Sequence, residues 1–264
     1  MMKLSISNIA WSEESDLEIY GFLKGYGFSG LEIAPTRIFK NQPYEKLQEA
    51  KDFSAFLKNE FELEISSMQS ICFGKNEAIF GTDEERTILS DYIKKAIDFA
   101  DAIGCKNLVF GSPKNRIIGK NSIQIAYDFF EKLGEYAKLK NTILALEPNP
   151  VIYGTDFINT TVQAFDFVKE INSEGLKVNF DFGTFLHNNE NINDIEKNID
   201  WINHFHISEP YLELIKHREI HQKLINIILD NGYKNYVSIE MKNMNSIQNV
   251  KKTILYLNKL AYAS

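Results

Sequence analysis

Eight short apolar runs rich in β-branched residues alternate along the chain with longer segments of helical periodicity. The runs cover residues 4–9, 30–33, 63–68, 107–110, 143–146, 177–180, 204–207 and 236–239. Near-continuous apolar runs of this length are typical of parallel strands that are buried on both faces. The alternation therefore predicts repeated strand–helix units and a parallel sheet.

The segments between the runs carry signals for the beginning and the end of helices. Residues 83–103 place apolar side chains at steps of three and four, and Thr82 with Glu85 is typical of a capping box. Gly27, Gly104 and Gly232 each stand between a helical segment and the next apolar run. Glycine at this position supplies the left-handed residue that turns the chain back. We therefore expect helices that end at these glycines.

The length of the chain favours a closed barrel. Its 264 residues divided among eight units give 33 residues a unit, as in a (β/α)8 TIM barrel of about 250 residues. An open, doubly wound sheet is the alternative, but no glycine-rich phosphate-binding motif follows any run. No linker or charge block divides the chain. We therefore predict an α/β fold with a single (β/α)8 TIM barrel domain over residues 1–264.

Charge and cysteine content narrow the classes of partner. A net charge of −7 argues against nucleic acid or an anionic membrane surface as the main partner. Cys72 and Cys105 have no metal-binding spacing and are expected to be free thiols in a reducing cytoplasm. The first residues lack the apolar core of a signal peptide, and no apolar run reaches the roughly 18 residues of a membrane helix. We expect a cytoplasmic protein without nucleic-acid or membrane partners.

Acidic residues and a histidine stand where the last four runs end. Glu147, Asp181, His206 and Glu240 follow one another at intervals of 34, 25 and 34 residues, each about one strand–helix unit. The carboxyl ends of barrel strands form the working face, so these side chains are expected to meet on one rim. Two Glu, one Asp and one His suit Mn²⁺ or Mg²⁺, and also accept Co²⁺, Fe²⁺ or Zn²⁺.

Each of these four residues has an ordinary structural interpretation when it is taken alone. A glutamate after a strand often caps a helix, and a histidine there is more often structural than a ligand. Three carboxylates on one rim, however, repel one another strongly unless a cation or protons neutralise them. The combination therefore predicts a divalent-metal site, with Mn²⁺ favoured.

Four segments carry a resemblance to a known family. The strings LEPNP, FDFGT, HFHISEP and VSIEMK resemble the xylose-isomerase-like barrel superfamily, and the likeness extends over nearly the whole chain. That superfamily includes sugar epimerases, hydroxypyruvate isomerase, inosose dehydratase and endonuclease IV. The resemblance implies metal ligands at Glu147, Asp181, His206 and Glu240. It further implies that Glu147 and Glu240 are a catalytic acid/base pair, and that the protein forms a homo-oligomer.

The ligand set and the resemblance together predict a divalent-metal-dependent isomerase or epimerase of a sugar or sugar phosphate. An ion that binds a carbonyl and an adjacent hydroxyl acidifies the neighbouring C–H, and one carboxylate removes that proton to give a cis-enediolate. Return of the proton to the other face gives epimerisation, and return to the adjacent carbon gives isomerisation.

Three other functions stay open at this point. One is a metal-dependent dehydratase that acts on a sugar or an inositol-like polyol. A metal-assisted phosphodiesterase is disfavoured by the acidic charge and by the presence of only five histidines. The third is a barrel without catalytic activity that binds a ligand.

Two positions depart from the ketose 3-epimerase pattern. Thr184 stands where that branch has a histidine, and Leu212 where it has an arginine. In the branch, both residues contact substrate oxygens, so the departures put a plain ketose 3-epimerase in doubt. The candidates to replace them are His187, His217, Arg218 and His221, for which a solvated helix face is the structural alternative.

Further residues near the predicted rim are candidates for contacts with substrate. Ser112, Lys114 and Arg116 follow the fourth run and offer a grip for a phosphate or carboxylate, although a polar turn is the structural alternative. An apolar wall against a sugar ring is predicted from Asn8, Trp11, Phe73 and Tyr153. The substrate-binding residues that we predict are Glu32, Gln69, Arg116, Asn149 and His221.

Overall fold

Each of the eight apolar runs forms a strand within residues 2–262, which the computed structural model describes. The strands are β1 (Lys3–Ser7), β2 (Gly30–Ile33), β3 (Glu64–Met68), β4 (Leu108–Phe110), β5 (Leu144–Leu146), β6 (Leu176–Asp181), β7 (Ile202–Ile207) and β8 (Tyr236–Ile239). Neighbouring strands pair in parallel in chain order, and β8 pairs with β1, so the sheet closes. The predicted (β/α)8 barrel is confirmed.

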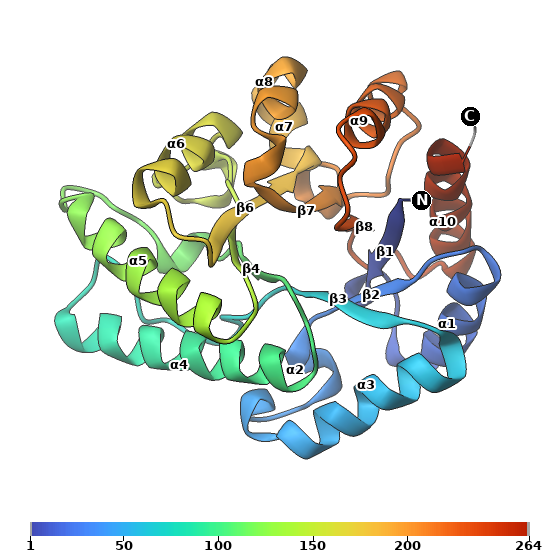
Figure 1. Cartoon of the computed structure of the whole chain (residues 1–264), viewed down its shortest axis with the longest axis horizontal. Helices are drawn as coiled ribbons and strands as arrows, with labels where there is room; N and C mark the ends of the chain where they lie inside the picture. Colours follow the sequence, from blue (N-terminus) through green and yellow to red (C-terminus); the bar gives the residue numbers. More distant parts are fainter. Residues whose placement is uncertain (1, 263–264) are drawn as a thin grey trace.

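Helices surround the barrel on the outside (Figure 1). The α-helices are α1 (Asp16–Gly25), α2 (Pro35–Ile38), α3 (Leu47–Phe61), α4 (Asp83–Ala102), α5 (Gln124–Leu139), α6 (Thr161–Ile171), α7 (Phe182–Asn188), α8 (Ile192–Lys197), α9 (Glu219–Asp230) and α10 (Ile247–Tyr262). Short 3-10 helices are η1 (Asn8–Ala10), η2 (Glu13–Ser15), η3 (Pro43–Glu45), η4 (Pro113–Asn115), η5 (Val151–Tyr153), η6 (Ile199–Trp201) and η7 (Pro210–Leu212). Several of these short helices lie in the loops that follow strands.

The predicted helix signals have the expected local geometry. Thr82 caps α4, because its hydroxyl accepts from the Glu85 backbone N–H at 3.2 Å, while the Glu85 carboxylate accepts from the Thr82 N–H at 2.7 Å. Gly27, Gly104 and Gly232 have φ angles of 73°, 72° and 63°. Both the capping box and the left-handed glycines are thereby confirmed.

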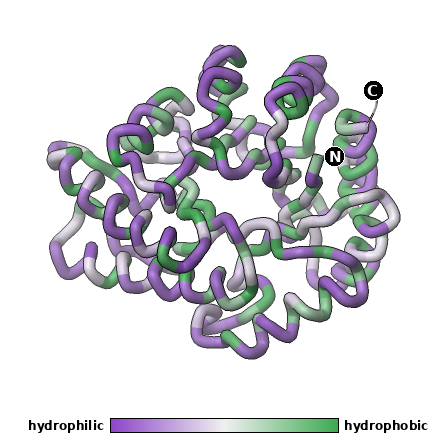
Figure 2. Tube along the Cα trace, in the orientation of Figure 1, coloured by the Kyte–Doolittle hydropathy of each residue, from purple (hydrophilic) through white to green (hydrophobic). Residues whose placement is uncertain are grey.

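The core lies between the strands and the helices. Phe110 on β4 packs edge-on against Phe130 on α5 with ring centroids 5.2 Å apart, and Phe130 packs against Phe167 on α6 at 5.6 Å. Along the outer helices, hydrophobic and hydrophilic residues alternate (Figure 2), as expected when one face of each helix covers the sheet. Cys72 and Cys105 are buried free thiols, as predicted.

Polar side chains lie inside the barrel at both ends. Near the amino ends of the strands, Ser5 and Ser66 share a hydrogen bond of 2.6 Å, and the Asn107 amide donates to Ser67 at 2.9 Å. Toward the carboxyl ends, buried acidic and histidine side chains fill the interior. Among residues 2–262, no helix has the length and apolar character required to cross a membrane.

The capping box gives a direct test of what stabilises α4. We expect Thr82→Ala to lower the free energy of unfolding by about 1 kcal/mol, because the first turn loses its side-chain acceptor. Urea denaturation measures the difference. Thr87→Ala, at an exposed position inside the same helix, is the matched control and is expected to cause no loss, since alanine favours helix. Equal destabilisation by both variants would contradict the role assigned to the cap.

Candidate metal centre

The last four strands bring Glu147, Asp181, His206 and Glu240 together. Each residue offers one potential ligand atom, a carboxylate oxygen or a histidine nitrogen, and these four atoms all lie within 4.8 Å of one another. All four residues are buried. Glu147 and Glu240 directly follow β5 and β8, whereas Asp181 ends β6 and His206 lies in β7. The structure thus gathers the four residues that the strand-end pattern singled out.

Hydrogen bonds of the barrel fix the backbone at these positions. Asp181 is the register partner of His206 across β6 and β7. The Glu147 N–H donates to the carbonyl of Phe110 at 3.1 Å, and the Glu240 N–H donates to that of Ile207 at 3.0 Å. The four side chains therefore start from a rigid frame, which is what a preorganised ion site requires.

Room for Glu147 depends on the residue that follows β4. A Cβ atom added at Gly111 would collide with the Glu147 carboxylate. The absence of a side chain at Gly111 therefore lets this carboxylate lie against the neighbouring strand end.

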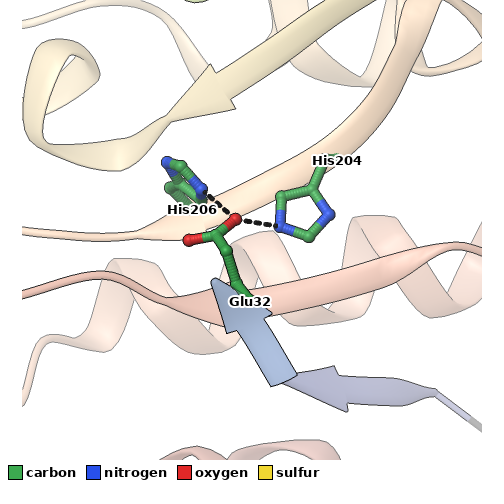
Figure 3. A group of neighbouring side chains, drawn as sticks. All are labelled: Glu32, His204 and His206. Carbon is green, nitrogen blue, oxygen red and sulfur yellow. Dashed lines mark hydrogen bonds and ion pairs between the residues drawn. The ribbon is translucent and has the colours of Figure 1, made fainter. Parts of the chain in front are cut away.

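Glu32 holds the ring of His206 from inside the barrel (Figure 3). Its carboxylate oxygen Oε2 lies 2.9 Å from His206 Nε2 and 3.1 Å from His204 Nε2. The other ring nitrogen, Nδ1 of His206, faces Glu147 Oε1 at 3.0 Å and Glu240 Oε2 at 3.2 Å. A proton on Nε2 that is donated to Glu32 leaves the Nδ1 lone pair for an ion, which is the usual arrangement of a metal-bound histidine with a carboxylate partner.

This position corrects the prediction that Glu32 contacts substrate. Glu32 is fully buried, and it is absent from the walls of the cavity above the four residues. Burial opposes its ionisation, but the charges and hydrogen bonds of His206 and His204 hold its pKa below the usual range. Glu32 is therefore a buried anion that positions a potential metal ligand.

Asp181 is held at both carboxylate oxygens. Its Oδ2 accepts from the backbone N–H and from the hydroxyl of Thr184, each at 2.7 Å, and its Oδ1 accepts from the Ser208 hydroxyl. The Thr184 hydroxyl also lies 3.0 Å from the Pro148 carbonyl oxygen. Thr184 thus supports a carboxylate at the position where the epimerase pattern has a substrate-contacting histidine.

The charges at this centre call for a cation. Burial raises the pKa values of Glu147, Asp181 and Glu240, and mutual repulsion raises them further. Burial alone would lower the pKa of His206, but Glu240, Glu32 and Glu147 raise it well above its usual value. The raised pKa values show that neutralising part of the negative charge stabilises the cluster, and three hard oxygen donors with one imidazole fit a divalent ion for that role.

A cavity of about 850 Å³ opens over the centre. Glu147, Asp181 and Glu240 form part of its walls, and the predicted substrate residues Gln69 and Asn149 also line it. Other predicted residues that line the cavity are Ser112, Lys114, Phe73 and Tyr153, whereas Asn8 and Trp11 do not.

Arg116 does not reach this cavity. Its side chain is fully buried, and Nη2 donates to the backbone carbonyl of Glu147 at 2.7 Å. Burial lowers the pKa of Arg116 to about 10. Its own carbonyl accepts from the Thr155 hydroxyl at 3.0 Å. Arg116 therefore ties the loop after β4 to the loop after β5, which corrects the prediction that it contacts substrate.

His221 also lies away from the cavity. It is buried on α9, with its ring 4.5 Å from that of Phe182 and its Nδ1 2.9 Å from the Tyr256 hydroxyl. Burial lowers its pKa to about 4. The prediction of substrate contact is therefore corrected, since the helix packs this face inward. The other three candidate replacements, His187, His217 and Arg218, do not line the cavity either.

Asn179, Tyr211 and Lys242 were missing from the sequence-based prediction of the site. Asn179 lies within hydrogen-bonding distance of Glu147 and His206. Its place two residues before Asp181, on the same face of β6, is the signal that identifies it. Leu212, at the position of the epimerase arginine, lines the cavity beside Tyr211 and Lys242. An apolar residue and a lysine therefore occupy this part of the wall.

The sequence profile of the xylose isomerase-like TIM barrel family matches residues 21–260. The chain belongs to this family. No curated protein matches the sequence. The crystal structure of 3-keto-D-glucoside 4-epimerase from E. coli resembles this xylose isomerase-like barrel with a TM-score of 0.78 and 20% identity, over 98% of this chain and 99% of that one.

Two other solved structures resemble this xylose isomerase-like barrel at similar levels. D-Psicose 3-epimerase from Clostridium cellulolyticum H10 has a TM-score of 0.73 and 14% identity, over 99% of this chain and 96% of that one. The probable 3-DHS dehydratase of Bacillus anthracis has a TM-score of 0.72 and 18% identity, over 97% of this chain and 98% of that one. At these identities, the likeness establishes a shared fold.

The raised pKa values predict how ion binding depends on pH. Protons and a divalent ion compete for the same atoms of His206, Glu147 and Glu240, so apparent Mn²⁺ affinity is expected to rise with pH. The rise is about tenfold per pH unit for each proton displaced. Calorimetry in two buffers of different ionisation enthalpy, between about pH 6 and about pH 8, counts the protons released. Affinity that does not change over this range would contradict the protonated state of the ion-free centre.

Proposed function

We propose that this barrel is a divalent-metal-dependent isomerase or epimerase of a sugar or sugar phosphate. The observation that carries the proposal is a pair of buried glutamates, Glu147 and Glu240, that belong to the four-residue cluster and also line the cavity. A group that both holds an ion and faces a substrate is suited to proton transfer next to a polarised carbonyl.

The donor set accounts for how the ion is held and for what it supplies. Glu147, Asp181, His206 and Glu240 would hold it, with Mn²⁺ favoured by the mixture of carboxylates and imidazole. Once bound, a divalent ion polarises a substrate carbonyl and so acidifies the adjacent C–H. Glu32 fixes the ring of His206, while Thr184 and Ser208 fix Asp181.

The two glutamates then carry out the proton transfer. One carboxylate accepts the proton from the carbon next to the carbonyl, which gives the cis-enediolate, and the other returns a proton. Burial raises both pKa values, and a carboxyl group whose pKa lies closer to neutrality is the better general acid and base at physiological pH. Return to the opposite face gives the epimer, and return to the neighbouring carbon gives the isomer.

The cavity walls suit a polyhydroxylated substrate. The Asn149 carbonyl oxygen Oδ1 is buried and has no hydrogen-bond partner in the described chain, so it can accept from a sugar hydroxyl. Gln69 adds a second amide to the lining, and the apolar side chains of Ile9, Val109 and Leu212 also form part of the cavity wall. Two of the structurally similar proteins are epimerases of sugar-like compounds by name, which supports this substrate class.

Hydrogen exchange gives a test that does not require the product to be known. The wild-type protein, loaded with Mn²⁺ in D₂O, is expected to incorporate deuterium next to the carbonyl of a substrate from a panel of ketoses, ketose phosphates and keto-glycosides. We expect Glu240→Gln to slow this exchange by at least about 100-fold, because general acid–base catalysis contributes 10²–10⁴-fold. Mass spectrometry measures the incorporated deuterium.

Glu45→Gln is the matched control, because Glu45 pairs with Lys95 at the surface and does not line the cavity. Its exchange rate is expected to equal that of the wild-type protein. A Glu240→Gln variant that retains Mn²⁺ and exchanges at the wild-type rate would rule out the assigned proton transfer.

A dehydratase is the second candidate function. It is favoured by Leu212 in the cavity wall and by Thr184 behind Asp181, since neither offers the substrate contacts of the ketose 3-epimerase pattern. The likeness in fold to a probable dehydratase points the same way. The same base can remove a proton while a β-hydroxyl leaves, and the product then weighs one water less than the substrate. Product mass therefore separates the two functions.

A further inference from the structure

Asn179 points its amide into the middle of the ligand cluster. It is fully buried on β6, two residues before Asp181. Its Nδ2 atom lies 2.7 Å from Glu147 Oε1 and 3.1 Å from His206 Nδ1. The amide oxygen Oδ1, at the other end, has no hydrogen-bond partner among the described residues.

The spacing of these atoms matches that of neighbouring ligands around one ion. Ligands at right angles on an octahedral ion, each bound at about 2.1 Å, lie about 3.0 Å apart. Glu147 Oε1 and His206 Nδ1 are 3.0 Å apart, and the Asn179 amide end completes a triangle with them at 2.7 and 3.1 Å. Glu240 Oε2 lies 3.2 Å from His206 Nδ1. The amide end therefore lies at ligand spacing from two of the four residues of the cluster.

The chemistry of an amide decides which of its two ends faces inward. The NH₂ group and the oxygen of the Asn amide are similar in size, and a 180° rotation of the side-chain amide exchanges their positions. No donor holds the oxygen at the outer end, so the inner neighbours determine the choice. Carboxylates without a cation attract the NH₂ group, whereas a divalent cation attracts the oxygen, which is a hard ligand.

We infer that Asn179 is an additional ligand of the divalent ion and binds it through the amide oxygen, alongside Glu147, Asp181, His206 and Glu240. The inference rests on the metal centre of the proposed function. A neutral oxygen adds a ligand without adding a fourth negative charge to a buried cluster. Five protein ligands would still leave room on the ion for oxygen from solvent or substrate.

Two substitutions at this position separate a ligand from a hydrogen-bond donor. Asn179→Leu removes both polar atoms at similar size, and Asn179→Asp supplies an oxygen in either orientation but no N–H. We expect Asn179→Leu to weaken Mn²⁺ binding by more than about 10-fold, a loss that an outer-shell partner can also cause. The aspartate variant separates the two roles: if Asn179 is a ligand, Asn179→Asp binds Mn²⁺ at least as tightly as the wild-type protein. Calorimetry on substrate-free protein measures both values.

The visible spectrum of bound Co²⁺ gives a readout of coordination number. Six-coordinate Co²⁺ absorbs weakly and lower coordination absorbs more strongly. We expect a weak spectrum for the wild-type and Asn179→Asp proteins and a stronger one for Asn179→Leu. Asn107→Leu, which removes a buried amide that binds Ser67 near the other end of the barrel, is the matched control and is expected to leave affinity and spectrum unchanged.

The outcomes distinguish failure of the inference from failure of the proposed function. Wild-type protein that binds neither Mn²⁺ nor Co²⁺ overturns the metal centre and the inference with it. If the wild-type protein binds the ion tightly, two results overturn only the fifth ligand. One is a Co²⁺ spectrum that does not change in Asn179→Leu, and the other is a Mn²⁺ affinity of Asn179→Asp as low as that of Asn179→Leu. Asn179→Ala, which needs less room, replaces the leucine variant if thermal unfolding shows that leucine does not fit.

Discussion

Repulsion among three buried carboxylates is the constraint around which the carboxyl-terminal rim of this barrel is built. Glu147, Asp181 and Glu240 lie within reach of one ion, and His206 stands between them with both ring nitrogens facing carboxylate oxygens. The raised pKa values of Glu147, His206 and Glu240 indicate that positive charge, from protons or from a cation, stabilises this cluster. A divalent ion neutralises the negative charge of the cluster more effectively than protons do. When the ion displaces protons from the carboxylates, those carboxylates become able to accept a proton from a substrate.

The barrel supplies the rigidity that such a cluster needs. Strand pairing fixes the backbone at the four positions. Buried partners fix the ligand residues: Glu32 holds the ring of His206, Thr184 holds the carboxylate of Asp181, and Arg116 holds the backbone carbonyl of Glu147. Two of these partners, Glu32 and Arg116, are residues whose polarity first suggested contact with substrate. Their buried charges act on the ligands, while the cavity above is lined by a mixture of amides and apolar residues.

The fold was largely predictable because its signals are local. Buried parallel strands require short apolar runs, and the capping residue Thr82 and the left-handed Gly104 mark helix ends in the sequence itself. The strand-end residues could be grouped because barrel geometry places them on one rim. The direction of an individual polar side chain depends on tertiary packing, and for this reason Glu32 and His221 were assigned to the cavity although both face buried partners. Asn179 was not predicted because it lies inside an apolar run, and only its contacts with Glu147 after β5 and His206 on β7 show its role.

The most direct measurement for this account is a crystal structure grown with Mn²⁺, with anomalous scattering recorded at the manganese absorption edge. The account predicts one strong anomalous peak at bonding distance from Glu147, Asp181, Glu240 and Nδ1 of His206, with Glu32 still bound to Nε2. No peak at this cluster, in crystals where Mn²⁺ occupies surface carboxylates instead, would contradict it.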